Sequence, residues 1–337
     1  MLLQIFVTAF YNNYEIEVEN MNTKVVVING ERINYDGSID YNILSDYVVV
    51  YKDSTNEEVI ERIKGAGIVV SKEYPLKRDM IEKFDDSVKL LCEAGTGYNN
   101  IDLEACKEKG IMVCNIPAYS SECVAQTAMM MILNLASSMR VQMKMLENKD
   151  HSNFTDRLQV NHFELMGKTI GLVGLGNIGS EVAKIANAFG MKVLAYRRTP
   201  KENTDVITYC SLEELLKNSD FISLHCPLSD ATYHLIGEKE LNLMKETSFI
   251  INTARGALID EKALIEALQN HKIAGAGLDV QEIEPPTPDN PLYDMENVIL
   301  TPHMGWRGKE TRLRLVNILA DNIKHYIDGN PINVVSK

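Results

Sequence analysis

A glycine-rich turn between an apolar strand and a helical segment constrains the fold of this chain more than any other feature. The run 169–173 is predicted to be a buried strand, Gly174-Leu175-Gly176-Asn177-Ile178-Gly179 follows it directly, and a helical pattern covers 180–189. In such a turn the first glycine permits the tight bend, the second lets a pyrophosphate approach, and the third allows close helix–strand packing. The free N–H groups of the helix N-terminus attract the phosphates. This context predicts a dinucleotide-binding βαβ unit, whereas the glycines alone would also fit an ordinary loop.

Short apolar runs rich in valine and isoleucine alternate with helical patterns along nearly the whole chain. Near-continuous apolar strands separated by helices belong to parallel sheets covered on both faces, so the chain is expected to be α/β. The length of 337 residues suits two domains. The expected strands are 25–29, 47–51, 68–70, 89–92 and 111–115 in a first set, and 169–173, 192–196, 221–225, 248–252, 274–279 and 298–300 in a second.

A long apolar helix is predicted over 123–139, between the two sets of strands. Because a helix that is apolar on most sides must be buried all round, it lies either in a domain core or between subunits, and both alternatives remain open. A second long helix, 309–327, follows the last strand and could cross back to the first domain.

Charge and composition exclude several classes of function. A formal net charge of −13 argues against a nucleic-acid-binding protein, because neutralising phosphates takes clustered Lys and Arg. Six cysteines without a Cys-x-x-Cys pair fit reduced thiols rather than a disulfide framework or a zinc site, so no metal is expected. No segment approaches the roughly 20 apolar residues that span a bilayer, and the N-terminal segment lacks the basic start of a signal peptide. We therefore expect a cytoplasmic protein.

The end of the strand after the glycine turn indicates which dinucleotide fits. An NAD site usually carries Asp or Glu about 20 residues after the turn, to hold the ribose 2′-hydroxyl. Here the strand 192–196 continues into Arg197-Arg198-Thr199-Pro200, without a carboxylate. Two guanidinium groups suit a 2′-phosphate, which accepts bidentate charge-assisted hydrogen bonds. The sequence favours NADP over NAD, with solvated strand-end charges as the alternative.

Three further strands lead into ionisable residues at their carboxyl ends, where ligands bind in open α/β sheets. Arg255 follows the strand 248–252, Glu284 follows 274–279, and His303 follows 298–300. Taken separately, Arg255 could form a surface ion pair, Glu284 could be a solvated loop charge and His303 could be a cap. Their succession beyond a nucleotide-binding turn predicts instead that the three side chains meet in one site.

These motifs resemble the D-isomer-specific 2-hydroxyacid dehydrogenase family, over essentially the whole chain from Lys24 to Val335. Gln126, Trp306 and the closing segment 329–335 resemble its glycerate dehydrogenase and hydroxypyruvate reductase branch. Arg197 and Arg198 depart from the NAD preference that is common in the family. The matching stretches are 95–102, 174–179, His225-Cys226-Pro227-Leu228 with Thr232, Thr253-Ala254-Arg255-Gly256, Asp279-Val280 through Glu284-Pro285, and Thr301-Pro302-His303.

The resemblance implies an α/β fold of two Rossmann-like, doubly wound parallel-sheet domains with a cleft between them. Residues 21–118 plus 304–337 would form a discontinuous, flavodoxin-like substrate domain, and residues 119–303 the dinucleotide-binding Rossmann domain. Residues 1–20 precede the first strand and are a possible N-terminal extension.

The resemblance also implies roles for individual residues. Arg255 would hold a substrate carboxylate and polarise the keto oxygen, and His303 would donate a proton to that oxygen. A neighbouring Glu284 carboxylate favours the protonated imidazole and keeps the acid loaded. The remaining implied contacts are Thr96, Gly97 and Trp306 for substrate, and Gly174, Gly176, Asn177, Ile178, Gly179, Arg197, Arg198, Cys226, Pro227, Thr232, Thr253, Ala254, Asp279 and Gly305 for cofactor.

The implied reaction is hydride transfer from NAD(P)H to a small 2-ketoacid, giving the D-2-hydroxy acid. Hydroxypyruvate or glyoxylate is the expected substrate, and a homodimer is the expected assembly. The alternatives are a dehydrogenase for a bulkier ketoacid, a phosphoglycerate dehydrogenase, and, from another class, a nucleotide-sensing scaffold similar to transcriptional co-repressors.

Overall fold

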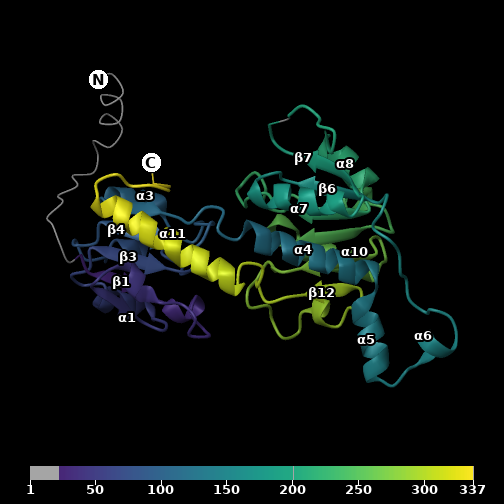
Figure 1. Cartoon of the computed structure of the whole chain (residues 1–337), viewed down its shortest axis with the longest axis horizontal. Helices are drawn as coiled ribbons and strands as arrows, with labels where there is room; N and C mark the ends of the chain where they lie inside the picture. The colour runs from purple at the N-terminus through teal and green to yellow at the C-terminus, as the bar shows by residue number, and fades with distance from the viewer. Residues whose placement is uncertain (1–22, 200, 337) are drawn as a thin grey trace. The chain divides into compact units, whose positions relative to one another are not determined.

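The computed structural model describes residues 23–199 and 201–336, so the possible extension over residues 1–20 lies outside the described residues. The chain divides into two compact units (Figure 1). The first holds residues up to Tyr119 together with Arg307–Lys337, and the second holds Ser120–Trp306. The sequence analysis places the two divisions slightly earlier, after residues 118 and 303.

The first unit is built on a parallel sheet of five strands in the order β2-β1-β3-β4-β5, which is the order of flavodoxin-like folds. Its strands are β1 (Val25–Val27), β2 (Val48–Val50), β3 (Ile68–Ser71), β4 (Leu90–Glu93) and β5 (Met112–Cys114). Its helices are α1 (Asn56–Arg62), α2 (Arg78–Ile81), α3 (Leu103–Glu108) and α11 (Lys309–Ile327), with short 3-10 turns η1 (Gly30–Arg32) and η2 (Tyr41–Leu44).

The C-terminal helix α11, yellow in Figure 1, belongs to the first unit because it packs on β4 and η2. Arg312 has a side chain only 2% exposed, and it forms an ion pair of 2.6 Å with Asp36 and donates to the carbonyl of Ile33 at 3.0 Å. The guanidinium holds the pKa of Asp36 well below its usual range. Further along the helix, Asn322 donates to the carbonyl of Asn115 at 2.9 Å. These contacts fix the last part of the chain on the first sheet.

The second unit is built on a parallel sheet of seven strands in the order β12-β11-β10-β9-β6-β7-β8. This is the doubly wound Rossmann order extended by one strand, with the order reversing at β6 and β9. The strands are β6 (Thr169–Val173), β7 (Lys192–Tyr196), β8 (Ile207–Tyr209), β9 (Phe221–Leu224), β10 (Phe249–Asn252), β11 (Gly275–Leu278) and β12 (Val298–Leu300). The helices are α4 (Ser121–Ala136), α5 (Met139–Glu147), α6 (Ser152–Thr155), α7 (Asn177–Ala188), α8 (Leu212–Asn218), α9 (Glu238–Leu243) and α10 (Glu261–Gln269), with 3-10 turns η3 (Gly256–Leu258) and η4 (Pro291–Tyr293).

Both faces of the second sheet are buried, as near-continuous apolar strands require. Successive side chains of a strand point to opposite faces, so Ile250 packs with apolar residues of α8, α9 and α10, whereas Ile251 packs with those of α4 and α7. Sequence analysis missed the edge strand β8, because its middle residue is exposed, its two end residues are only partly buried, and the three form no apolar run.

The apolar helix predicted over 123–139 is α4, and it is buried within the second unit against α7, β10 and β11. It ends earlier than predicted, at Ala136, because Ser138 takes a left-handed backbone conformation with φ of 46°. The following helix α5 has no buried residue. Packing inside this unit therefore accounts for the burial that the sequence of α4 requires.

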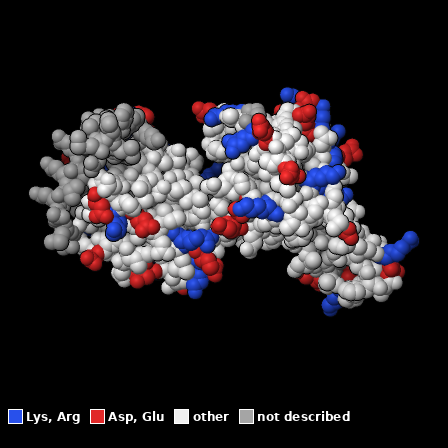
Figure 2. All heavy atoms as spheres, turned by 45° about the horizontal axis from the view of Figure 1, so that its top comes forward, with Lys and Arg blue, Asp and Glu red and all other residues white. Residues whose placement is uncertain are grey.

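The surface carries charges of both signs. On the face drawn in Figure 2, basic and acidic side chains are interspersed over the described residues. Among these residues, none of the helices combines the length and the apolar character needed to cross a bilayer.

Candidate active site and dinucleotide site

The glycine turn after β6 has the geometry that a pyrophosphate site needs. Gly174 has a φ of +97°, and a Cβ there would lie 2.7 Å from the backbone nitrogen of Cys226. A Cβ at Gly179 would lie 2.4 Å from the carbonyl oxygen of Gly174, so α7 can pack this closely only with glycine. A Cβ at Gly176 would meet no protein atom within 4 Å, which leaves the backbone open to a ligand. Asn177 and Ile178 then begin α7, whose first N–H groups are available to phosphate.

The residues after β9 lie beside the glycine turn, because a Cβ at Gly174 would come within 2.7–2.9 Å of the backbone of His225 and Cys226. Nε2 of His225 lies 2.9 Å from Oγ of Ser223, while Nδ1 is buried without a partner among the described residues. Burial lowers the pKa of His225 to about 4 and raises the pKa of Cys226 to about 11, so both are neutral near pH 7. Thr232 closes the following loop by donating to the carbonyl of Pro227 at 2.7 Å.

His225 should make the protein less stable in mild acid. The pKa of His225 is about 4 in the folded protein and 6.5 without burial. The unfolded chain therefore takes up a proton at this residue that the folded protein excludes, and the free energy of unfolding falls as the pH drops from 6.5 toward 4. The free energy of unfolding by urea should fall between pH 7 and pH 5. In His225→Gln this fall should be smaller by about 1 to 2 kcal/mol. His271→Gln, which changes an exposed histidine, is the control. A pH dependence that both variants share with the unsubstituted protein would contradict this assignment.

Arg197 and Arg198 follow β7, where the ribose of a dinucleotide is held in Rossmann domains. Arg197 is half-buried and Arg198 is exposed. Neither side chain makes a hydrogen bond or an ion pair within residues 23–199 and 201–336. Their guanidinium donors are thus not committed to protein acceptors.

Arg255 is presented by the loop that follows β10. Asn252, at the end of the strand, donates to the carbonyl of Arg255 at 2.8 Å and accepts from the N–H of Ala254 at 3.0 Å, which fixes the backbone on both sides. The Arg255 side chain is half-buried and donates to the carbonyl of Ala254 at 2.8 Å. Oγ1 of Thr253 is buried and has no partner within the described part of the chain. This strand end therefore offers a guanidinium on a fixed backbone and a hydroxyl that no other described residue contacts.

Asp279, at the end of β11, supports the loop that carries His303. Its buried carboxylate accepts from Oγ1 of Thr301 at 2.5 Å and from the N–H groups of Met304 and Gly305, each at 2.8 Å. Its own carbonyl accepts from the N–H of His303 at 2.8 Å. Asp279 thus holds the segment 301–305 in place. Trp306, the last residue of the second unit, is buried.

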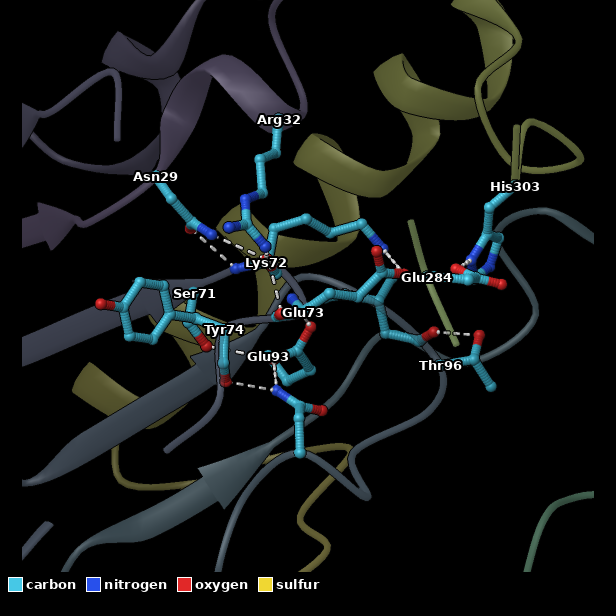
Figure 3. Close-up of polar contacts among 12 residues, drawn as sticks. Asn29, Arg32, Ser71, Lys72, Glu73, Tyr74, Glu93, Thr96, Glu284 and His303 are labelled. Atoms are coloured by element: carbon cyan, nitrogen blue, oxygen red, sulfur yellow. Dashed lines mark hydrogen bonds and ion pairs between the residues drawn. The ribbon is translucent and has the colours of Figure 1, made fainter. Parts of the chain in front are cut away.

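Glu284 and His303 form a hydrogen-bonded pair (Figure 3). Oε2 of Glu284 lies 2.8 Å from Nδ1 of His303, and Oε1 of Glu284 accepts from the N–H of Gln281 at 3.0 Å. Nε2 of His303 has no hydrogen-bond partner among the described residues. The contact with Glu284 fixes the orientation of the imidazole and leaves its Nε2 as the ring nitrogen available to a ligand. Since β10, β11 and β12 are neighbours, Arg255 leaves the sheet from a strand adjacent to this pair.

The loop containing Thr96 and Gly97 belongs to the first unit. Oγ1 of Thr96 donates to the carbonyl of Ile116 at 2.8 Å, and Asn115 donates to the carbonyl of Thr96 at 2.8 Å. Thr96 is exposed and Gly97 half-buried, so the backbone of this loop is accessible. These two contacts come from the segment directly after β5.

Sequence analysis missed a buried charged cluster at the ends of β3 and β4, drawn in Figure 3. The Lys72 side chain is 2% exposed and forms a 2.7 Å ion pair with Glu73. Buried Glu93 accepts from Oγ of Ser71, from the N–H of Glu73 and from Nδ2 of Asn100. Burial opposes the charged form of Lys72, but Tyr119 and the two glutamates raise its pKa, while burial raises the pKa of Glu93. Ionisable residues directly after apolar strands were the signal available in the sequence.

Comparison with known proteins identifies the family. A sequence profile described as "D-isomer specific 2-hydroxyacid dehydrogenase, NAD binding domain" matches residues 129–305, more than half of the chain. The chain belongs to the D-isomer specific 2-hydroxyacid dehydrogenase family. The resemblance and the α/β fold predicted from the motifs are thus confirmed. As a member, the chain is an oxidoreductase that acts on CH–OH groups with a nicotinamide cofactor.

Relatives in this family cover most of the chain. It is 39% identical over 326 residues to a hydroxypyruvate reductase of Blautia hydrogenotrophica, with 93% of this chain and all of that protein aligned. It is 43% identical over 280 residues to a D-3-phosphoglycerate dehydrogenase of Methanocaldococcus jannaschii, with 82% of this chain but 52% of that protein aligned.

Solved structures of a dehydrogenase and a reductase also align with most of this chain. A D-lactate dehydrogenase of Aquifex aeolicus, complexed with NAD and lactic acid, has a TM-score of 0.81 and 32% identity, covering 93% of this chain and 99% of that one. An acyclic imino acid reductase in complex with NADPH and D-Arg has a TM-score of 0.80 and 34% identity, covering 93% and 99%.

Proposed function

We propose that this family member reduces hydroxypyruvate or glyoxylate to the corresponding 2-hydroxy acid, D-glycerate or glycolate, and uses NADPH in preference to NADH. The observation that carries the proposal is the Glu284–His303 hydrogen bond of 2.8 Å, beyond the carboxyl ends of β11 and β12. The strand that presents Arg255, β10, pairs with β11. The aligned hydroxypyruvate reductase, which matches over its full length, supports the substrate class.

Arg255 is the carboxylate-binding residue in this proposal. Its planar guanidinium can donate two parallel hydrogen bonds to a carboxylate, which fixes the orientation of a 2-ketoacid as well as its charge. The backbone hydrogen bonds from Asn252 keep the loop in one conformation. In the first unit, the backbone N–H groups of Thr96 and Gly97, on the accessible loop after β4, are the candidate donors to a substrate carboxylate. The proposal therefore selects substrates with a carboxylate next to the carbonyl group.

His303 is the general acid for reduction and the general base for the reverse reaction. Its imidazolium donates a proton to the keto oxygen as that oxygen becomes an alcohol, and its Nε2 is the ring nitrogen that no other described residue contacts. Glu284 accepts from Nδ1, which orients the ring. A nicotinamide cofactor, when bound at the glycine turn, supplies the hydride.

The proposed cofactor contacts follow the structure of the second unit. Gly174, Gly176, Asn177, Ile178 and Gly179 would hold the pyrophosphate, and Cys226, Pro227 and Thr232 would line its other side. Thr253, Ala254, Asp279 and Gly305 would lie toward the nicotinamide. The unpartnered Oγ1 of Thr253 supports this assignment, because a buried hydroxyl needs a hydrogen-bond partner.

A panel of 2-ketoacids with both reduced cofactors tests the proposal. Purified protein is mixed with NADPH or NADH and with hydroxypyruvate, glyoxylate, pyruvate, phenylpyruvate or 3-phosphohydroxypyruvate, and oxidation of the cofactor is followed by absorbance. We expect the highest kcat/KM with hydroxypyruvate or glyoxylate, and D-glycerate as the product from hydroxypyruvate. Tight cofactor binding without turnover of any ketoacid would reject the proposal.

The preference for NADPH is assigned to Arg197 and Arg198. Replacing both with alanine should weaken NADPH binding by about tenfold or more, since charge-assisted hydrogen bonds to the 2′-phosphate are lost, and should change NADH binding little. Fluorescence titration of each cofactor measures both constants. Lys201→Ala, which removes a nearby exposed charge, is the control. An equal loss for NADPH and NADH would contradict the assignment.

We also propose a homodimer in the cytoplasm. Several large apolar side chains are exposed on α5, on α6 and in the loop after it, with Phe154 77% exposed, and exposed apolar patches of this kind commonly form protein interfaces. All six cysteines are free thiols, which suits a reducing compartment. Sedimentation velocity of the purified protein tests the assembly.

A further inference from the structure

A second histidine lies between the loops that present Arg255 and Glu284. The N–H of His234 donates to the carbonyl of Ala257 at 2.8 Å, and the N–H of Ile236 donates to that of Leu258 at 3.0 Å. The segment 234–236 is therefore paired with the backbone just beyond Arg255. Backbone hydrogen bonds of this kind fix one side of His234 to the loop after β10.

The imidazole of His234 contacts the loop that carries Glu284. Its Nε2 lies 2.8 Å from Oε1 of Glu282. The backbone N–H groups of Glu282 and Glu261 each donate to the other residue's carboxylate, at 3.1 and 3.3 Å. The ring of Tyr233 stacks on the imidazole with 3.9 Å between centroids. Glu282 is consequently held by the histidine and by the start of α10.

Gln281 links this anchor to the catalytic groups, because it directly precedes Glu282 in the chain. Its N–H donates to Oε1 of Glu284 at 3.0 Å. Its carbonyl oxygen lies against Gly256, where a Cβ would come within 1.9 Å of it. A displacement of Glu282 would move both the donor to Glu284 and the contact with the residue after Arg255.

We propose that His234 is a positioning residue: its Nε2–Glu282 hydrogen bond holds the loop of Glu284 against the loop of Arg255. The inference rests on the roles given above to Arg255, Glu284 and His303. It concerns alignment alone, since His234 donates no proton to substrate. The other carboxylate near the ring, Asp260, lies 4.0 Å from Nδ1 and is too distant for a hydrogen bond.

Two substitutions separate this role from a purely structural one. The backbone of His234 is left-handed, with φ of 49°, a conformation that asparagine tolerates better than glutamine. The glutamine amide can replace Nε2 and reach Glu282, whereas the asparagine amide replaces only Nδ1. Backbone conformation therefore favours His234→Asn, and the proposed hydrogen bond favours His234→Gln.

The first measurement is steady-state reduction of the best ketoacid, with thermal unfolding beside it. We expect His234→Asn to lower kcat by about tenfold or more, because small misplacements of catalytic groups are costly, and His234→Gln to retain most of it. The asparagine variant should be at least as stable to heat as the glutamine variant. NADPH binding, measured by fluorescence, should be the same in both.

The second measurement is hydrogen–deuterium exchange of peptides covering 279–286, which needs no turnover. Exchange should be faster in His234→Asn and close to that of the unsubstituted protein in His234→Gln. If exchange is unchanged in both, or if kcat follows thermal stability rather than the Nε2 contact, the inference is overturned. A protein that reduces no ketoacid but shows the expected exchange would reject the proposed function and retain the anchor.

Discussion

Replacing His303 with asparagine should lower kcat for ketoacid reduction by about 10²- to 10⁴-fold, the range that a positioned general acid contributes. The substitution is structurally conservative. Nδ1 of His303 lies 2.8 Å from Glu284, and an asparagine amide can donate in its place. The left-handed backbone at this position, with φ of 48°, also suits asparagine. The loss should therefore come from the missing proton donor.

Steady-state kinetics together with a fluorescence titration of NADPH would separate the two effects of His303→Asn. We expect cofactor affinity to stay within about twofold, because the glycine turn and Asp279 are untouched. A kcat that falls by less than tenfold would exclude His303 as the general acid. Unchanged exchange of the 279–286 peptides would show that the loop is intact.

Arg255→Lys should lower kcat/KM for 2-ketoacids by about 100-fold or more. Lysine keeps the positive charge but cannot form the two parallel hydrogen bonds of a guanidinium, and each charge-assisted hydrogen bond contributes about 1.5 to 3 kcal/mol. Asn252 bonds to the backbone around position 255, so the loop should keep its conformation. The loss of kcat/KM should therefore come from the changed side chain.

The matched measurement determines kcat/KM for a 2-ketoacid and for its amide, with the unsubstituted enzyme and with Arg255→Lys. The unsubstituted enzyme should strongly prefer the ketoacid, and Arg255→Lys should lose most of that preference. A variant that keeps the full preference for the carboxylate would show that Arg255 does not bind it, and the substrate would have to be held by other groups.

The sequence predicted those parts of the fold whose signals are local. The run 169–173 is apolar throughout and is followed by a glycine turn, and β6 has these bounds. The helix at 309–327 also has its predicted bounds. In contrast, β8 pairs with β7 through backbone groups, and such pairing leaves no apolar run in the sequence. The end of α4 depends on the left-handed conformation of Ser138. A serine does not predict that conformation, because it is glycine that usually adopts it.

In the candidate site too, the sequence predicted some contacts and not others. Glu284 and His303 follow neighbouring strands, so strand order alone predicts that they approach, and they are in contact. His234 lies in a loop, and its contact with Glu282 depends on how that loop folds back on the residues after Arg255. Lys72 and Glu93 come from adjacent strands, but nothing in the sequence shows that their charges are buried together.

The separation of the first unit into two stretches of chain affects how the protein can be made. The second unit is continuous from Ser120 to Trp306, so all of it is synthesised before α11. Domains generally fold as units during synthesis. The packing of α11 on β4 and the ion pair of Arg312 with Asp36 can form only after that helix has been made. In nascent chains that end before α11, the Rossmann unit should therefore become resistant to protease first, while the N-terminal portion remains sensitive.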